Sequence, residues 1–207
     1  MKSRTKNLLH TAVALVAFGL STTTLLAEEA STNAGLIGRS SLTLGYTHTK
    51  GDFDITGDAG GIAFSIPVSS FVDLGFGYSY SFSETRYYWE DLTAHALTAS
   101  ALFHVPVEQA KWFIEPTLDI ARLSVENRST EETFFEISTG FEMPVSEYIA
   151  LTPYFYYSDF FAYESDASYG FGLGMELAAS NQVSFLLGGT IGNESVKTVS
   201  VGIAFKL

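Results

Sequence analysis

The 207-residue sequence predicts an all-β fold, an antiparallel up-and-down transmembrane β-barrel with ten strands. Three observations carry this prediction. Segments from Ser40 onward alternate with a period of two between an apolar face and a small or polar face, a short turn recurs about every 37 residues, and no apolar run after residue 26 is long enough for a membrane helix. Because 46% of the residues are hydrophobic, the apolar faces need lipid or a core to cover them.

The alternation is clearest in the last segment. One face carries Val199, Val201, Ile203, Phe205 and Leu207, and the other carries Thr198, Ser200, Gly202, Ala204 and Lys206. Residues 72–82 and 168–177 repeat the pattern, with aromatic and aliphatic residues against Gly and Ser. A soluble sandwich would place charged residues on its water-facing side. Small residues instead suit the narrow interior of a barrel.

The repeated turn divides the chain into hairpins. Pro67, Pro106 and Pro144 each end a segment and are followed within a few residues by an aromatic side chain, and Ala179–Gln182 occupies the equivalent place further on. Polar loops separate these turns, which is typical of transmembrane barrels with short turns on one side. The predicted strands are 39–49, 59–67, 71–82, 93–105, 112–124, 132–143, 148–160, 167–178, 183–192 and 196–207, with eight strands as the alternative count.

The first residues indicate export. Lys2, Arg4 and Lys6 precede an apolar stretch from residue 8 to residue 20, as in a secretory signal peptide. We expect cleavage after Ala27, giving residues 1–27 as signal peptide, 28–38 as a flexible periplasmic tail and 39–207 as the barrel; an uncleaved anchor helix is the alternative. Cleavage removes three cations and no acid, so the formal net charge changes from −12 to −15.

Composition excludes several classes of site. Only 11 Lys and Arg stand against 23 Asp and Glu, which argues against a nucleic-acid partner because phosphate binding needs clustered cations. The chain has no Cys, so it has no disulfide, thiolate metal site or Cys nucleophile. We expect no cofactor.

Four features together carry a resemblance: the leader, the alternation, the repeated turn and the closing strand. Residues 38–207 resemble the small outer-membrane β-barrels, the OmpA-like and porin-like superfamily of Gram-negative cell envelopes. The resemblance implies a location in the bacterial outer membrane, contact with outer-membrane lipid and lipopolysaccharide, and assembly by the barrel-insertion machinery. It also implies a C-terminal insertion signal in Val201, Ile203, Phe205 and Leu207. The family's last residue is usually aromatic, whereas here Phe205 is followed by Lys206 and Leu207.

The alternation assigns a set of ionisable side chains to the inward face, all close to the short turns or the barrel ends: Arg39, Asp73, His104, Glu115, Glu142, Glu176 and Lys206. We expect them to form one layer near the periplasmic end. Three interpretations stay open for it: a wet lining without a role, a hydrogen-bonded plug, or a constriction whose acid excess favours cations. Asp119 and Glu136, higher on the same face, extend the acidic bias.

Catalytic and metal sites are weakly indicated. His48 and His95 fall near the outer ends of their strands and point to the lipid side by parity, with no Ser–His pairing or His-x-x-x-His spacing. Asp52, Asp54 and Gly57 match three places of a calcium loop, but its closing Glu is missing. The sequence therefore predicts neither an enzyme nor a metal site.

Aromatic residues gather near the outer ends of the strands. Tyr87–Trp89 with Tyr80 and Phe82 form one group, and the aromatic residues of 154–163 form another; both favour an interfacial girdle over a ligand platform. Arg122 and Arg128 flank the third outer loop and are candidates for lipopolysaccharide phosphates.

These observations favour a non-enzymatic integral outer-membrane barrel with a structural or surface-interaction role and a narrow, polar, plugged lumen. The main alternative is a narrow, cation-preferring, porin-like channel. A lipid- or peptide-hydrolysing barrel enzyme is the third hypothesis.

Overall fold

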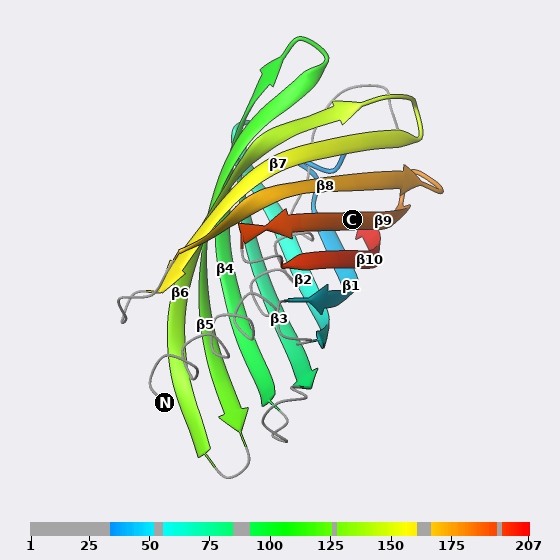
Figure 1. Ribbon diagram of the computed structural model, residues 1–207. Helices are drawn as coiled ribbons and strands as arrows, with labels where there is room; N and C mark the ends of the chain where they lie inside the picture. Colours follow the sequence, from blue (N-terminus) through cyan, green and yellow to red (C-terminus); the bar gives the residue numbers. More distant parts are fainter. Residues whose placement is uncertain (1–33, 52–55, 85–91, 126–127, 161–166, 194–195) are drawn as a thin grey trace.

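The computed structural model describes residues 34–51, 56–84, 92–125, 128–160, 167–193 and 196–207. Ten antiparallel strands close into a barrel in which each strand pairs with its sequence neighbours and β1 pairs with β10 (Figure 1). The strands are β1 (Ser41–Lys50), β2 (Thr56–Ser69), β3 (Val72–Glu84), β4 (Leu92–Val107), β5 (Ala110–Val125), β6 (Arg128–Pro144), β7 (Ile149–Phe160), β8 (Ser168–Ala178), β9 (Val183–Gly192) and β10 (Lys197–Lys206). No helix in this part of the chain is long and apolar enough to cross a membrane.

The predicted count of ten strands is confirmed, and each predicted segment overlaps one strand. The largest boundary differences are at β2, which begins at Thr56, and β6, which begins at Arg128. In both places polar residues extend the ladder: Thr56 pairs with Glu84, and Arg128 pairs with Val125. Backbone hydrogen bonds do not require apolar side chains, so pairing continues where hydropathy alternation fades.

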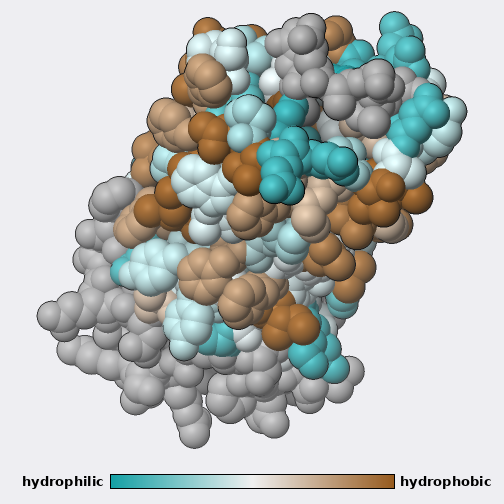
Figure 2. Space-filling view, turned by 90° about the horizontal axis from the view of Figure 1, so that it is seen from above, coloured by the Kyte–Doolittle hydropathy of each residue, from teal (hydrophilic) through white to brown (hydrophobic). Residues whose placement is uncertain are grey.

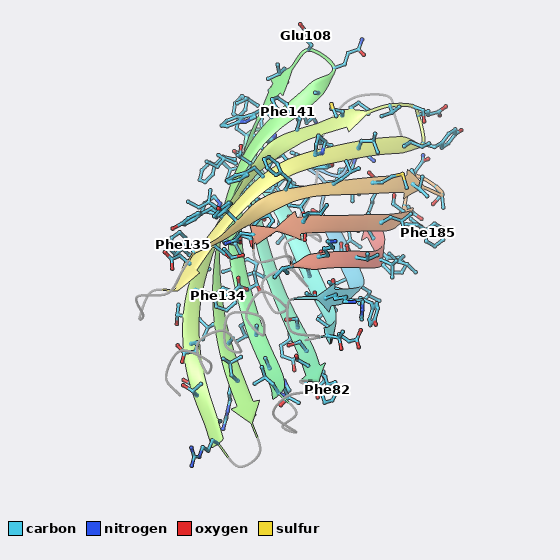
Figure 3. All side chains as sticks on the ribbon, in the orientation of Figure 1. Phe82, Glu108, Phe134, Phe135, Phe141 and Phe185 are labelled. Carbon is cyan, nitrogen blue, oxygen red and sulfur yellow. The ribbon has the colours of Figure 1, made fainter. Side chains whose placement is uncertain are left out.

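The two faces of the wall are as the alternation predicts. Outward positions carry large apolar side chains, which Figure 2 shows in brown over the outer surface, and Figure 3 shows Phe135, Phe141 and Phe185 projecting from the wall. Phe76 is 54% exposed and Leu173 is 52% exposed. Inward positions carry buried Ser, Thr, Ala and Gly together with a set of buried acids. An apolar outside and a polar inside are the pattern of a barrel that sits in lipid.

The barrel has two unequal halves. We call β2–β6 the tall wall, because these strands have 13 to 17 residues. We call β7–β10 together with β1 the short wall, because these strands have 10 to 12 residues. We call the end with the turns at 70–71, 108–109, 145–148 and 179–182 the turn end, and the opposite end the loop end. Glu108, with a φ of 56°, lies at the tip of the turn between β4 and β5 (Figure 3).

Two tyrosines that the sequence assigned to an interfacial girdle point into the barrel instead. Tyr154 and Tyr156 are 7% and 0% exposed. A Cβ at Gly172 would lie 2.1 Å from Cζ of Tyr154, and a Cβ at Gly170 would lie 2.5 Å from the Tyr156 hydroxyl. The tyrosine rings therefore occupy space that the glycines of β8 leave open, and the girdle prediction is wrong for these two residues. Tyr80 and Phe155 do face outward, at 43% and 36% exposure.

The segment before β1 also differs from the prediction of a flexible tail over 28–38. Ala34, Leu36 and Ile37 are at most 4% exposed, and Gly35 is buried with them. The physical reason is that this segment offers backbone N–H groups and two aliphatic side chains to a barrel interior that has acids and apolar gaps to receive them. Residues 28–33 lie outside the described part of the chain. The first strand begins at Ser41, two residues after the predicted start of the barrel.

Candidate functional site: carboxylates around the N-terminal segment

Three inward carboxylates at the turn end bind the backbone of residues 35–38, which we call the inner segment. Gly35 N–H donates to Oε2 of Glu176 at 2.6 Å, and Leu36 N–H donates to Oε2 of Glu142 at 2.8 Å. Ile37 N–H reaches Oε1 of Glu142 at 3.5 Å, and Gly38 N–H donates to Oδ2 of Asp73 at 2.8 Å. Four successive donors thus meet acids from three different strands, β3, β6 and β8. Hydrogen bonds to ionised acceptors are stronger than neutral ones.

Two glycines allow the inner segment to present these donors in one direction. Gly35 has a φ of 102° and Gly38 a φ of 92°, and such values are unfavourable for residues with a Cβ. The chain can therefore turn within the barrel while its N–H groups face outward toward the acids. A sequence without glycine at these places would pay about 1 kcal/mol or more in backbone strain at each.

Apolar contacts fix the inner segment from the other side. Ile37 belongs to a buried cluster with Leu102, Phe113 and Tyr154. Leu36 packs with Ala204 and with the partly buried Leu186. One residue earlier, Ala34 contacts Ala150 and Ala178 and donates its N–H to the carbonyl oxygen of Glu147 at 3.0 Å. The segment thus contributes its own side chains to the core of the barrel.

The acid on β8 has a full set of partners. In addition to the bond from Gly35 N–H, Glu176 accepts a hydrogen bond from Ser184 Oγ at Oε1, at 2.5 Å. The same oxygen forms an ion pair with Nζ of Lys206 at 2.7 Å. Lys206 and Glu176 are both buried. Because a buried charge without a partner is costly, the pair holds β8 and β10 in a defined arrangement around the segment.

The other residues predicted for the ionisable layer do not all lie at the inner segment. His104 Nε2 lies 3.6 Å from Oδ1 of Asp73, so these two are together. Glu115 is 2% exposed but lies further along β5, and Arg39 is half-buried just before β1. The structure thus brings Asp73, His104, Glu142, Glu176 and Lys206 to the inner segment or to its immediate partners.

Sequence reasoning missed Lys111. Its Nζ donates to the carbonyl oxygen of Ile37 at 3.4 Å, and its charge acts on Asp73, His104 and Glu142. The prediction started the strand at residue 112, whereas β5 begins at Ala110, and one more step of the alternation places Lys111 inward. The inner segment was missed for another reason: it has no alternation, and its fit depends on acids far away in the sequence.

Further acids lie nearer the loop end of the tall wall. Asp119 is 1% exposed and accepts a hydrogen bond from Thr98 on the neighbouring strand, and Glu136 is also 1% exposed. Both point inward as predicted. Phe134, the register partner of Asp119 on β6, is buried beside them. A cavity of about 40 Å³ remains beside Glu142, Thr152 and Tyr154, enough for one or two water molecules.

The outward histidines are partnered by acids or phenols. Nδ1 of His48 lies 2.9 Å from Oδ1 of Asp58, which also accepts a hydrogen bond from the Tyr46 hydroxyl. Nδ1 of His95 lies 2.7 Å from the Tyr78 hydroxyl. All of these side chains face outward, in agreement with the predicted lipid-side position of both histidines.

No group of three or more His, Asp or Glu residues that would suit a metal occurs within the described ranges. Asp52 and Asp54 of the calcium-loop pattern lie outside those ranges, as do Tyr87–Trp89, Phe161 and Tyr163 of the aromatic groups. The same holds for residues 1–27.

The remaining predicted residues are on the outside of the barrel. Val201, Ile203, Phe205 and Leu207 are 36% to 75% exposed along β10 and at its end. Arg122 faces outward, where its register partner across β5 and β6 is Glu131, and its Nη2 donates to Ser129 Oγ at 3.4 Å. Arg128 is exposed at the start of β6. The sequence made both arginines candidates for lipopolysaccharide phosphates, and this stays a prediction; an acid, Glu131, lies opposite Arg122 in the register.

Comparison with known proteins gives no match to a family model and none to a curated protein sequence. Among solved structures, the chain is similar to the translocator domain of the autotransporter NalP from Neisseria meningitidis, with a TM-score of 0.57 and 8% identity over 100% of this chain and 98% of that one. The β domain of the Bordetella autotransporter BrkA gives a TM-score of 0.54 and 8% identity, covering 82% and 100%.

The NanC porin gives a TM-score of 0.51 and 7% identity, covering 80% of this chain and 100% of that one. At such identities the likeness is one of fold: two of the three are domains of autotransporters and one is a porin. By its closed antiparallel architecture, its apolar outer face and these structural neighbours, the chain has the fold of the small outer-membrane β-barrels.

Proposed function

We propose that this protein is a non-enzymatic outer-membrane barrel with a structural or surface-interaction role, and that its lumen is closed at the periplasmic end by its own inner segment. The observation that carries the proposal is the capture of four successive N–H groups, from Gly35 to Gly38, by Asp73, Glu142 and Glu176. In this proposal the turn end faces the periplasm, because short turns lie on that side in barrels of this kind.

The interior above the inner segment supports closure over conduction. Phe113, Phe134 and Tyr156 are at most 1% exposed, and the cavity beside Tyr154 holds about 40 Å³. A conducting lumen needs a continuous water path, and the inner segment, held between the acids and these rings, would block that path at the turn end.

The histidines support a role without catalysis. His48 is engaged by Asp58, His95 by Tyr78, and His104 faces Asp73. Within the described residues these partners are carboxylates and a phenol, whereas an acyl-transfer enzyme would pair its histidine with a Ser or Thr hydroxyl.

Planar-bilayer conductance tests the proposal. We expect the mature chain, residues 28–207, to be silent, and a chain that begins at Arg39 to show single-channel steps. A chain that begins at Ala34 keeps the inner segment and is the matched control; it should stay silent. Heat-modified gel mobility reports whether each barrel is folded. Channel steps from the full mature chain, equal to those of the truncated one, would contradict the proposal.

One observation favours the second candidate, a cation-preferring channel. Asp119, Glu136, Glu115 and Glu132 are buried acids on the inward side of the tall wall beyond the inner segment. If the truncated barrel conducts, its reversal potential in a KCl gradient should show cation preference, because acids lining a narrow pore attract cations. An anion preference would remove this candidate.

A further inference from the structure

Strand β2 runs further toward the turn end than its neighbour β1. The last register pair between them is Ser41 with Ser65, whereas β2 continues to Ser69. Among the described strands, none pairs with β2 beyond Ser65 on the side of β1, and Val68 is 56% exposed there. Unpaired backbone N–H and C=O groups at a strand edge are a template for another strand. We call residues 66–69 the open edge.

The residues before β1 are in line with the open edge. Leu207 N–H donates to the Ser40 carbonyl oxygen at 2.9 Å, so β1 already pairs beyond its first residue on the side of β10. On the side of β2, the antiparallel register would continue through three further pairs, namely Ser40 with Ile66, Arg39 with Pro67 and Gly38 with Val68. In the structure the chain leaves this line at Gly38, whose φ is 92°, and enters the lumen. Gly38 is therefore the hinge between the lumen and the open edge.

Two of the three acids that hold the inner segment also have a lysine beside them. Glu176 forms an ion pair with Lys206 at 2.7 Å. Glu142 is the register partner of Lys111 across β5 and β6. A buried acid that loses all its partners is costly. Because both lysines belong to the wall and stay in place, the N–H groups of the inner segment can leave Glu142 and Glu176 without isolating a charge.

The third acid, Asp73, gains a cation when β1 becomes longer. Asp73 is the register partner of Pro67, and Pro67 is the residue that Arg39 would face. Arg39 then lies in the same inward row as Asp73, two strands and about 10 Å away. An arginine side chain and a carboxylate together span that distance, and guanidinium suits a carboxylate in both charge and shape. Asp73 thus exchanges the N–H of Gly38 for the cation of Arg39.

We propose that the inner segment has a second position, in which residues 37–40 lengthen β1 along the open edge and leave the lumen. The proposal rests on the proposed function, because this movement opens the barrel only if the inner segment closes it. In the lumen, four N–H groups bind carboxylates and Ile37 is buried. At the open edge, the backbone gains ladder hydrogen bonds and each of the three acids has a cation. Two arrangements that both satisfy the backbone and the charges make a two-state switch.

Cross-linking tests the second position directly, since the natural chain has no Cys. Gly38→Cys/Val68→Cys joins two residues that are opposite each other in the longer strand. In the lumen position they cannot meet, because Gly38 binds Asp73 inside the barrel while Val68 faces outward. We expect oxidation to give the disulfide-linked peptides, detected by mass spectrometry after digestion. Because a Cys at a φ of 92° itself disfavours the lumen position, absence of this link would overturn the proposal.

Val145 supplies the matched control for the cross-link. It also follows a proline at the turn end and is 61% exposed, but it lies after β6, away from the open edge. Gly38→Cys/Val145→Cys should therefore stay unlinked under the same oxidation. Equal linking of the two pairs would show that the released segment moves without a preferred place, and the longer β1 would be refuted.

Gly38→Val shifts the same equilibrium without a cross-link. Valine is unfavourable at a φ of 92° and favourable in a strand opposite Val68. The open probability in planar bilayers should rise about 5- to 30-fold, the factor that corresponds to the strain of one left-handed residue. Gly60→Val is the control, because a Cβ at this outward glycine meets only the Gly45 carbonyl oxygen, at 4.0 Å. It should leave the open probability within about twofold.

A disulfide across a lumen contact gives the opposite test. Leu36 packs with Ala204, so Leu36→Cys/Ala204→Cys should hold the inner segment inside the barrel when oxidised. Added to Gly38→Val, the oxidised pair should abolish the openings, and reduction should restore them. Heat-modified gel mobility shows whether each variant is folded. Openings that persist in the oxidised, folded variant would contradict the proposal.

The two measurements separate this inference from the proposed closure of the lumen. If the natural chain conducts as well as a chain that begins at Arg39, the closure is wrong, and the Gly38→Cys/Val68→Cys link alone decides whether the second position exists. If the natural chain is silent, Gly38→Val is equally silent and the cysteine pair stays unlinked, then the closure stands and the switch is refuted.

Discussion

The tall and short walls of the barrel share one alternation and differ in what they contribute. Inside, the tall wall carries most of the buried acids, including Glu142, together with Phe113 and Phe134. The short wall carries glycine, Ser and Thr, the two buried tyrosines of β7, Tyr154 and Tyr156, and one ion pair, Lys206–Glu176. Outside, both walls are apolar. The comparison teaches that the outward face contacts lipid throughout and is therefore uniform, whereas each inward side chain must fit its neighbours in the interior, as the glycines of β8 fit the tyrosines of β7.

The buried ion pair on the short wall is the strongest test of this complementarity. Lys206→Met should lower the free energy of unfolding by about 3–5 kcal/mol, because it leaves Glu176 buried without its cation. Urea unfolding in lipid vesicles, followed by tryptophan fluorescence, measures the change. Lys206→Met combined with Glu176→Gln should recover much of the loss. If the single variant matched the natural chain, the short wall would have no electrostatic part in closing the barrel.

A charge placed near the middle of the membrane tests whether both walls face lipid. Ile203→Arg on the short wall and Phe76→Arg on the tall wall should each lower the free energy of unfolding by about 2–4 kcal/mol. Val199→Arg, closer to the rim, should cost about 0–1 kcal/mol. The same unfolding titration measures all three. Unequal losses at Ile203 and Phe76 would show that one wall faces something other than lipid.

The space that Gly172 leaves for the Tyr154 ring can be tested by substitution. Gly172→Ala should lower the free energy of unfolding by about 1–3 kcal/mol, because its Cβ would overlap the Tyr154 ring. Gly60→Ala is the control: there the nearest atom to a Cβ is the Gly45 carbonyl oxygen at 4.0 Å. Gly172→Ala with Tyr154→Leu should be milder than Gly172→Ala alone. A loss at Gly60 as large as that at Gly172 would point to strand propensity instead of the ring.

The smallest effect on stability is expected from removing only the hydroxyl of Tyr154, which separates its role from that of the ring. Its buried hydroxyl makes no hydrogen bond in the described structure, so Tyr154→Phe should change the free energy of unfolding by less than about 1 kcal/mol or raise it. Tyr154→Ala should lower it by about 3–5 kcal/mol, as for other buried rings. A large loss of stability in Tyr154→Phe would mean that the hydroxyl, and not the ring, makes the stabilising contact.

The sequence was sufficient for the ten strands and for the side that most strand residues face, because alternation is a local property that lipid enforces along every strand. It also placed Asp73, Glu142 and Glu176 inward and near one end. Tyr154 and Tyr156 were within reach of the same reasoning: Ala150 and Thr152 mark the inward parity of β7, but aromatic residues on both faces hid it.

The inner segment was beyond local reasoning. Nothing in residues 34–38 alternates, and the partners of its N–H groups belong to β3, β6 and β8. The unequal strand lengths were hidden in a similar way, since Ser129, Thr130 and Glu131 extend β6 by backbone pairing without apolar alternation. What a strand pairs with across the barrel, or receives within it, is set by distant residues.

The inner segment also has a consequence for the order of assembly. Glu176 lies 141 positions after Gly35, and the Lys206 that completes its set of partners is almost the last residue of the chain. Contacts of such sequence separation form late, because the chain between them must be ordered first. Protease access to residues 34–38 should therefore persist through the hairpin stages of folding and end only when β10 has joined β1, so that a cut in this stretch distinguishes an open sheet from a finished barrel.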